Sequence, residues 1–229
     1  MAEPLEIFHA ESGCRRCGTC CEKGGPSLHL ADKPLVVEGH IPLRCLFTIR
    51  KGERVRDNVR GGLVPLNREI IKIRGRDGRW TCHFYDRDNR GCGIYASRPM
   101  ECRVLDCRDT RGIEAVYAVD RMTREDLLGE VSGLWELVCE HEQRCGYDRL
   151  WALMERGPVD GRYREEAAML EMLRYDTHLR QLMVEKSAMD AGMLDFLLGR
   201  ALTETIQSVG LGLVKRGGDY HLVPGADSR

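Results

Sequence analysis

The sequence is poor in aromatic residues and has no long apolar run, and both absences narrow what the chain can be. Aromatic side chains make up 6% of the 229 residues, which is few for a protein that stacks the bases of nucleic acids. No apolar stretch approaches the roughly 20 residues of a membrane-spanning helix. The first 13 residues lack the basic and apolar regions of a signal peptide. We therefore expect a cytoplasmic protein without a membrane segment.

Common catalytic and nucleotide-binding patterns are absent from the sequence as well. There is no P-loop, no G-x-G-x-x-G pattern and no Ser-His-Asp grouping that stands out. The sequence therefore points to no catalytic residue and leaves open whether the protein is an enzyme.

Cysteine, in contrast, is abundant, with 11 residues. The segment Cys14–Cys21 has the spacing C-x2-C-x2-C-C, in which thiolates three residues apart can converge on one ion. Gly18 lets the backbone come close to that ion. Cys20 and Cys21 are adjacent and should point apart, so we expect that they do not both bind the same ion. In a reducing compartment, thiols at this spacing indicate metal or redox chemistry rather than disulfides.

A second block of cysteines follows about sixty residues later in WTCHFYDRDNRGCGIYASRPMECRVLDC. Eight thiols are enough for two four-thiolate sites or for one site with spare ligands, and both remain open. The C-x2-C-x2-C run is closer to iron–sulfur than to zinc usage, so we expect an iron–sulfur cluster of the 4Fe-4S form, with zinc as the alternative. The predicted metal ligands are Cys14, Cys17, Cys20, Cys21, Cys82, Cys92, Cys102 and Cys107. The remaining cysteines, Cys45, Cys139 and Cys145, are expected to be packed or free thiols.

The two blocks together resemble the CxxCxxCC family of zinc- or iron-chelating proteins, also called YkgJ-type cysteine-cluster proteins. The resemblance rests on both cysteine spacings and on the string CGIYASRPMECR, and it covers roughly residues 12–110. It implies metal binding by the cysteines, without an assigned activity. A relative, the flagellin lysine N-methylase, carries a similar cysteine set, but no methyl-donor-binding motif is found here.

Basic residues gather around the cysteines. Residues 44–111 contain 17 Lys and Arg against 9 Asp and Glu. This excess could mark a nucleic-acid surface, but compensation of anionic thiolate sites explains it better, since aromatic residues are sparse. Tyr95, Arg98 and Arg103 are predicted to fix the loop around the ligands. His29 and His40 are not predicted as ligands, because a lone histidine is more often structural or exposed.

The patterns predict an α+β fold with a cysteine-cluster domain at residues 1–112 and a helical region at residues 113–229 that ends in a small hairpin. In the first part, Ile41–Arg50 is expected to be a short helix, and EIIKIR with RWTCHFY (residues 69–85) to form a β-hairpin that presents Cys82. In the second part, Thr123 begins a capping box, and helices are expected near residues 124–138, 147–156, 161–187, 190–198 and 202–209. A hairpin should follow from Leu211.

Three classes of function agree with these features. The first is a redox, electron-transfer or metal-delivery protein that acts on a protein partner not identified by the sequence. The second is an enzyme that uses the metal centre, for example a methyltransferase similar to the flagellin lysine N-methylase. The third is a structural zinc module that binds a partner protein. An open coordination position would favour the enzyme, and a closed four-thiolate site would favour the structural role.

Overall fold

The computed structural model describes residues 14–57, 61–76, 78–155, 157–159, 162–187, 189–217 and 219–225. The chain folds into two compact units. Unit 1 consists of Met1–His40 and Ile73–Met122, and unit 2 of Ile41–Lys72 and Thr123–Arg229. The two units are therefore interleaved in the sequence, because each contains two separate segments of the chain.

Unit 1 is built from short elements joined by turns. Its helices are α1 (Thr19–Glu22), α2 (Lys33–Val37), α3 (Met100–Val104) and α4 (Arg111–Val116), with 3-10 turns at Leu30–Asp32 and Tyr95–Ser97. Its two short strands, β5 (Tyr85–Asp86) and β6 (Gly91–Cys92), form an antiparallel pair. Few of its apolar side chains are fully buried, namely Leu28, Ile73, Cys82, Tyr85 and Met122 among the residues described.

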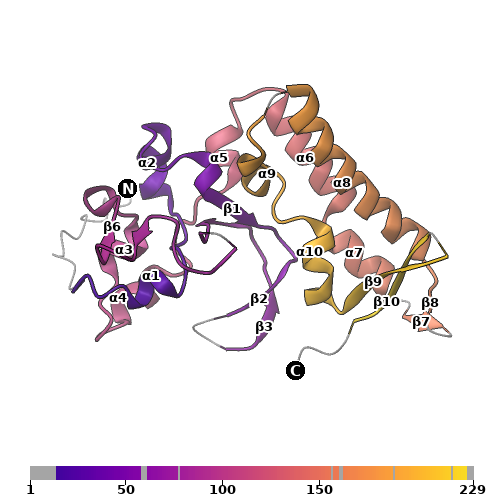
Figure 1. Cartoon of the computed structure of the whole chain (residues 1–229), viewed down its shortest axis with the longest axis horizontal. Helices are drawn as coiled ribbons and strands as arrows, with labels where there is room; N and C mark the ends of the chain where they lie inside the picture. Colours follow the sequence, from indigo (N-terminus) through magenta and orange to yellow (C-terminus); the bar gives the residue numbers. More distant parts are fainter. Residues whose placement is uncertain are drawn as a thin grey trace, which may run out of the picture. The chain divides into compact units, whose positions relative to one another are not determined.

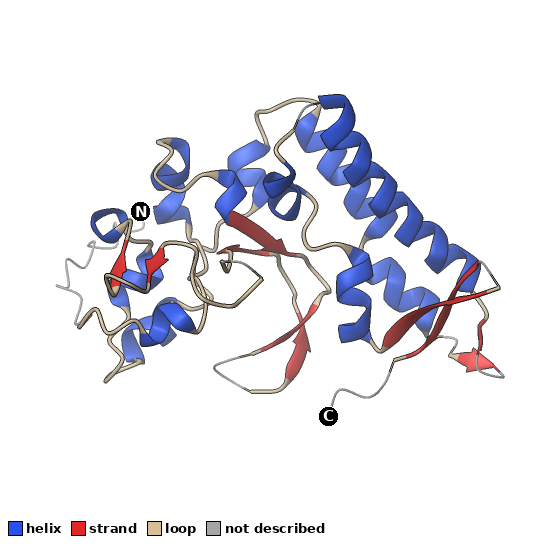
Figure 2. Ribbon diagram, viewed as in Figure 1, coloured by secondary structure: helices blue, strands red, loops and turns tan. Residues whose placement is uncertain are grey.

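The strands of unit 2 are short and paired in twos (red in Figure 2). β1 (Leu46–Ile49) pairs with β4 (Ile70–Ile73), whose last residue is assigned to unit 1. β2 (Arg54–Arg56) pairs with β3 (Leu63–Pro65), and β7 (Pro158–Val159) with β8 (Arg162–Tyr163). The chain ends in the antiparallel hairpin of β9 (Leu211–Arg216) and β10 (Asp219–Pro224), which confirms the predicted terminal hairpin.

Helices dominate the rest of unit 2. They are α5 (Arg124–Leu128), α6 (Leu134–Cys145), α7 (Tyr147–Met154), α8 (Glu166–Ser187), α9 (Leu194–Leu197) and α10 (Leu202–Thr205), with 3-10 turns at Leu43–Cys45, Ala191–Met193 and Ile206–Val209. Figure 1 shows α6 and α8 running side by side. The capping box at Thr123 forms with Asp126, as predicted. The helix expected near residues 124–138 is divided into α5 and α6 at Gly133, whose positive φ of 80° is unfavourable for other residues.

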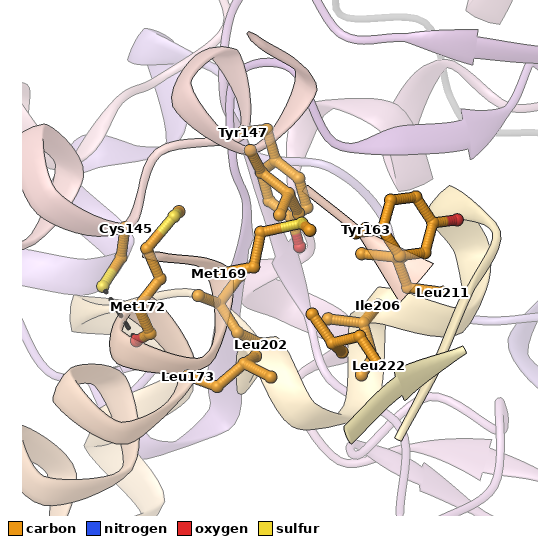
Figure 3. Close-up of a cluster of buried hydrophobic side chains, with 11 residues drawn as sticks. Cys145, Tyr147, Tyr163, Met169, Met172, Leu173, Leu202, Ile206, Leu211 and Leu222 are labelled. Atoms are coloured by element: carbon orange, nitrogen blue, oxygen red, sulfur yellow. Dashed lines mark hydrogen bonds between the residues drawn. The ribbon is translucent and has the colours of Figure 1, made fainter. Parts of the chain in front are cut away.

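The main apolar core of unit 2 gathers around one face of α8. Met169, Met172 and Leu173 project from this helix. Figure 3 shows them beside Cys145, Tyr147, Tyr163, Leu202, Ile206, Leu211 and Leu222, and Leu150 completes the core. The Cys145 thiol donates a hydrogen bond to the carbonyl oxygen of Met172 at 3.5 Å. Cys145 and Cys45 are buried, as predicted, and Cys139 is exposed.

Unit 2 also buries an arginine that bridges two carboxylates. Arg124 is 2% exposed and donates to Glu69 at 2.6 and 3.0 Å and to Glu142 at 2.8 Å. It also donates to the carbonyl oxygen of Leu197 at 2.6 Å. A buried charge is tolerated only when it is paired and hydrogen-bonded, so this network depends on each of its members.

A buried histidine and aspartate form a second polar contact in unit 2. His141 Nε2 donates to Asp176 Oδ1 at 2.8 Å, and the backbone N–H of Leu202 donates to Asp176 Oδ2 at 2.9 Å. Burial lowers the pKa of His141, although the hydrogen bond to Asp176 opposes this change. His141 is therefore held in its neutral form.

The structure corrects two expectations about the segment between the cysteine blocks. The predicted hairpin of residues 69–85 forms only at its turn end, where the N–H of Arg76 donates to the carbonyl oxygen of Thr81 at 2.9 Å and that of His83 to the carbonyl oxygen of Arg74 at 3.0 Å. β4 itself pairs with β1, and Ile70 and Ile71 are buried. The predicted return strand is a series of turns that meets the chain at one isolated bridge, between Gly75 and Cys82. The helix expected at Ile41–Arg50 is a 3-10 turn followed by β1.

The overall class is α+β, as predicted. Residues 41–72, expected in the cysteine-cluster domain, belong to unit 2, where β1 packs against α9 and Thr48 donates to the carbonyl oxygen of Phe196 at 2.6 Å. Residues 113–122 belong to unit 1, where Met122 N donates to the carbonyl oxygen of Leu28 at 3.1 Å. No helix in the described ranges has the length and apolar character needed to cross a bilayer.

Candidate metal site

The first cysteine block lies in a loop that turns into α1. Cys14 and Cys17 precede the helix, and Cys20 and Cys21 lie within it. Gly18 has a positive φ of 81°, and a Cβ at this position would overlap the Tyr85 hydroxyl group. Glycine is therefore required here both for the turn and for the close approach of Tyr85.

The four cysteines of the second block lie in four different local structures of unit 1. Cys82 is buried in the bridged turn after β4, and Cys92 ends β6. Cys102 lies in α3, the short helix predicted after Pro99. Cys107 is exposed in the turn that follows α3. All eleven cysteines of the chain are free thiols.

Backbone contacts bring the two blocks together. The N–H of Cys82 donates to the carbonyl oxygen of Cys21 at 2.7 Å. Tyr85, which pairs with Cys92 in the β5–β6 ladder, lies against Gly18 of the first block. The two blocks, about sixty residues apart in the sequence, are thus in direct contact within unit 1.

The thiols of both blocks also lie close enough to affect one another's ionisation. Burial raises the pKa of Cys102, and the thiolates of Cys82, Cys92 and Cys20 raise it further. The pKa of Cys92 is raised by burial and, more weakly, by Cys14 and Cys20. Like charges raise a thiol pKa only at short range, because the charged forms repel one another. We call the thiols linked in this way the thiol group, which comprises Cys14, Cys17, Cys20, Cys21, Cys82, Cys92 and Cys102.

Cys20 and Cys21 interact directly, so the expectation that they point apart is wrong. Their thiols are hydrogen-bonded to each other, which lowers the pKa of Cys20 to about 6 and raises that of Cys21. The reason is local structure, because neighbouring side chains diverge by about 100° in a helix such as α1 but alternate between opposite faces in a strand.

The thiol group fits a metal centre by its donor chemistry. Thiolates are the ligands used by structural zinc and by iron–sulfur clusters, and a bound cation would offset the mutual repulsion that raises these pKa values. Within the ranges that the structure describes, no three Cys, His, Asp or Glu side chains already surround a common ion position. Side-chain adjustments would thus be needed for coordination. Cys107 is not among the main influences on the pKa of any member of the group.

Tyr95 joins two arginines beside the thiol group. The guanidinium carbon of Arg16 lies 4.0 Å and that of Arg98 3.6 Å from the centre of the Tyr95 ring. Arg98 Nε also donates to the carbonyl oxygen of Tyr95 at 2.8 Å. Because Arg16 lies between Cys14 and Cys17, this cation–π stack fastens the first block to the Tyr95 loop.

Two further arginines near the cysteines have carboxylate partners. Arg103 lies 3.7 Å from Asp32 Oδ1, and Arg108 pairs with Asp106 in its own turn. Arg16 and Arg98, which both lie against the Tyr95 ring beside the first block, are placed to offset thiolate charge.

Sequence reasoning missed the polar residues beneath α3. His29, Asp32 and Glu101 are buried together, with exposed fractions of 0%, 0% and 7%. His29 Nδ1 donates to the carbonyl oxygen of Val119 at 2.7 Å, so this histidine is structural, as expected. Glu101 could have been singled out in the sequence because it directly precedes Cys102. A carboxylate beside a predicted thiolate ligand disfavours the thiolate form, so its presence there indicates a separate role.

Comparison with known proteins agrees with the site. No curated protein and no solved structure matches the chain significantly. Residues 13–120 match the family model CxxCxxCC, described as a putative zinc- or iron-chelating domain. The match contains all eight predicted ligands and confirms the resemblance found in the sequence. Over residues 13–120 the chain is therefore similar to the CxxCxxCC family of zinc- or iron-chelating domains.

Proposed function

We propose that the cysteine-cluster domain binds a single thiolate-ligated metal centre of the iron–sulfur type. The observation that carries this proposal is the gathering of thiols from both blocks into one group in unit 1. Two four-thiolate sites would need all eight cysteines, whereas the interactions described above link seven of them. The ligands of one centre would come from the thiol group, and the remaining thiols would be spare ligands.

The shallow position of the thiols supports a role in electron transfer or in delivery of the metal or cluster. Cys17 is exposed, and Cys14, Cys20 and Cys21 are partly exposed. A centre near the surface can exchange electrons or ligands with a protein partner, whereas a purely structural site is usually closed. When bound, the centre would supply redox chemistry, and the chain would supply its ligands and the compensating charges of Arg16 and Arg98.

Two pockets in the described residues have linings without cysteine. One of about 350 Å³ is lined by Lys51, Arg54 and Trp151 among others, and one of about 530 Å³ by Glu69 and Arg124 among others. Both belong to unit 2, and neither is lined by cysteine. Because neither lining includes a member of the thiol group, we favour a binding or delivery function at the thiol group over catalysis on a small substrate held in either pocket.

Anaerobic, chelator-free purification followed by iron, zinc and sulfide analysis tests the proposal. We expect iron and inorganic sulfide at one cluster per chain, with a visible absorption that bleaches on reduction. Stoichiometric zinc that is inert to exchange would instead favour the structural module. Protein without iron or zinc would refute metal binding altogether.

Cysteine substitutions should separate ligands from bystanders. Replacement of Cys20, Cys82 or Cys102 by Ser should lower the metal content, because each belongs to the thiol group. Cys107→Ser should leave one centre intact. The matched controls are the thiols of unit 2, in the variants Cys45→Ala, Cys139→Ala and Cys145→Ala, which should keep full metal content. Equal metal loss in both sets would contradict the assignment.

A further inference from the structure

The polar cluster of His29, Asp32 and Glu101 has no role in the metal chemistry described above, yet its hydrogen bonds hold the helix that carries Cys102. The backbone N–H of Met100, the first residue of α3, donates to Asp32 Oδ1 at 2.8 Å. The residue before the helix, Pro99, provides no side-chain cap. Asp32 therefore caps α3 from a distance of 68 residues in the sequence.

Glu101 makes the reciprocal contact from α3. Its Oε2 atom accepts a hydrogen bond from the N–H of Ser27 at 2.7 Å, and its Oε1 atom lies 3.4 Å from His29 Nε2. Asp32 Oδ2 in turn accepts from the N–H of His29 at 3.0 Å. The first turn of α3 is thus joined at two points to residues 27–32.

Residues 27–32 continue directly from the first cysteine block. Only five residues separate Cys21 from Ser27, and the intervening Pro26 accepts a backbone hydrogen bond from Ile73 at 3.0 Å. Contacts that fix α3 on this segment therefore also fix Cys102 relative to Cys20 and Cys21. This distance is the one that matters if thiols of both blocks share a centre.

Stability alone explains the cluster poorly. Burial raises the pKa of Asp32 despite its hydrogen bonds, which shows that its charged form is costly at this position. Glu101 adds a negative charge directly before Cys102 in the sequence. An apolar cluster of the same volume would avoid both costs, but it would not impose directional hydrogen bonds.

Building on the proposed function, we infer that Asp32, Glu101 and His29 are positioning residues of the metal centre, which hold the Cys102 thiol in place for metal binding by fixing the first turn of α3. They touch no metal themselves. Residues that orient metal ligands in this way typically change metal affinity by about 10–100-fold when they are replaced.

Cobalt binding tests the inference, because the cobalt–thiolate absorption reports the number and geometry of thiolate ligands as well as affinity. Asp32→Asn keeps the size of the side chain but leaves only one oxygen atom to accept from the two N–H groups. We expect its affinity for Co²⁺, measured by competition with a chelator, to fall about 10–100-fold, with an altered absorption spectrum at saturation.

Asp176→Asn is the matched control. Asp176 is also fully buried, contacts a histidine and accepts a backbone N–H, but it lies in unit 2. It should leave the affinity and the spectrum unchanged. Equal losses in both variants would show a general effect of destabilisation and overturn the inference.

Two variants at Glu101 distinguish positioning from charge. Glu101→Gln keeps an oxygen atom for the N–H of Ser27 and should bind Co²⁺ at least as tightly as the wild type, whereas Glu101→Ala should bind more weakly. If Glu101 acted only through its charge, both variants would bind more tightly, and the inference would be wrong. A wild type that binds no Co²⁺ and contains neither iron nor zinc would refute the proposed function itself. Normal binding by both wild type and Asp32→Asn would refute only the positioning role.

Discussion

Removal of the metal should unfold unit 1 and leave unit 2 folded, and residues 41–72 provide the sharpest test. Among the described residues, only five of the 28 fully buried apolar side chains belong to unit 1. At about 1.5–3 kcal/mol for each buried side chain, this core contributes about as much as the roughly 10–16 kcal/mol that a structural zinc supplies in zinc-finger peptides. Loss of the metal would therefore remove a stabilisation as large as the apolar core of the unit.

Hydrogen exchange followed by mass spectrometry measures this effect for each segment. A loss of only about 4 kcal/mol accelerates exchange through local unfolding about 1000-fold. Peptides from residues 14–40 and 73–122 should therefore exchange rapidly after anaerobic treatment with a chelator. Peptides from residues 41–57 and 61–72 should stay protected, although they lie between the cysteine blocks in the sequence, because they belong to unit 2.

Two results would refute this reasoning. If residues 41–72 lost protection together with the cysteine segments, the units would unfold as one cooperative body. If residues 14–40 and 73–122 kept their protection without metal, the few buried apolar side chains of unit 1 would be enough to keep it folded. The thiol group would then lie on a scaffold that is stable without metal.

Two further predictions concern the buried polar groups of unit 2. Arg124→Met should lower the free energy of unfolding by about 3–5 kcal/mol, because Glu69 loses its buried arginine partner and Glu142 keeps only Arg50, at 3.7 Å. Arg144→Met on the surface should cost less than about 1 kcal/mol in the same urea titration. A similar loss in both variants would contradict the role of the buried network. Acidification should destabilise unit 2 below about pH 6.5, by up to about 1.4 kcal/mol per pH unit, because His141 has a lowered pKa and the unfolded chain binds its proton first. His141→Gln, which cannot take up this proton, should show a smaller slope between pH 7 and pH 5, and equal slopes would argue against this assignment.

Features set by neighbouring residues were predictable from the sequence. The capping box at Thr123, the short helix after Pro99 and the terminal hairpin from Leu211 all form, because hydrogen bonds and turn geometry within a few residues determine them. The family of the cysteine domain was predictable for the same reason, since it rests on spacing within short motifs. Sequence alone thus identified the thiols as a chemical group.

Long-range contacts decided what local patterns could not. Residues 70–73 pair with β1 rather than with the segment that follows them, because β1 buries their isoleucine side chains within the sheet. Residues 41–72 belong to unit 2, whereas both cysteine blocks belong to unit 1. Asp32 caps a helix 68 residues away, and the periodicity of a sequence does not predict such a contact. The sequence by itself determined which atoms can bind a metal. Only the tertiary structure decided which of them come together, because side chains far apart in the chain meet only after the backbone between them has folded.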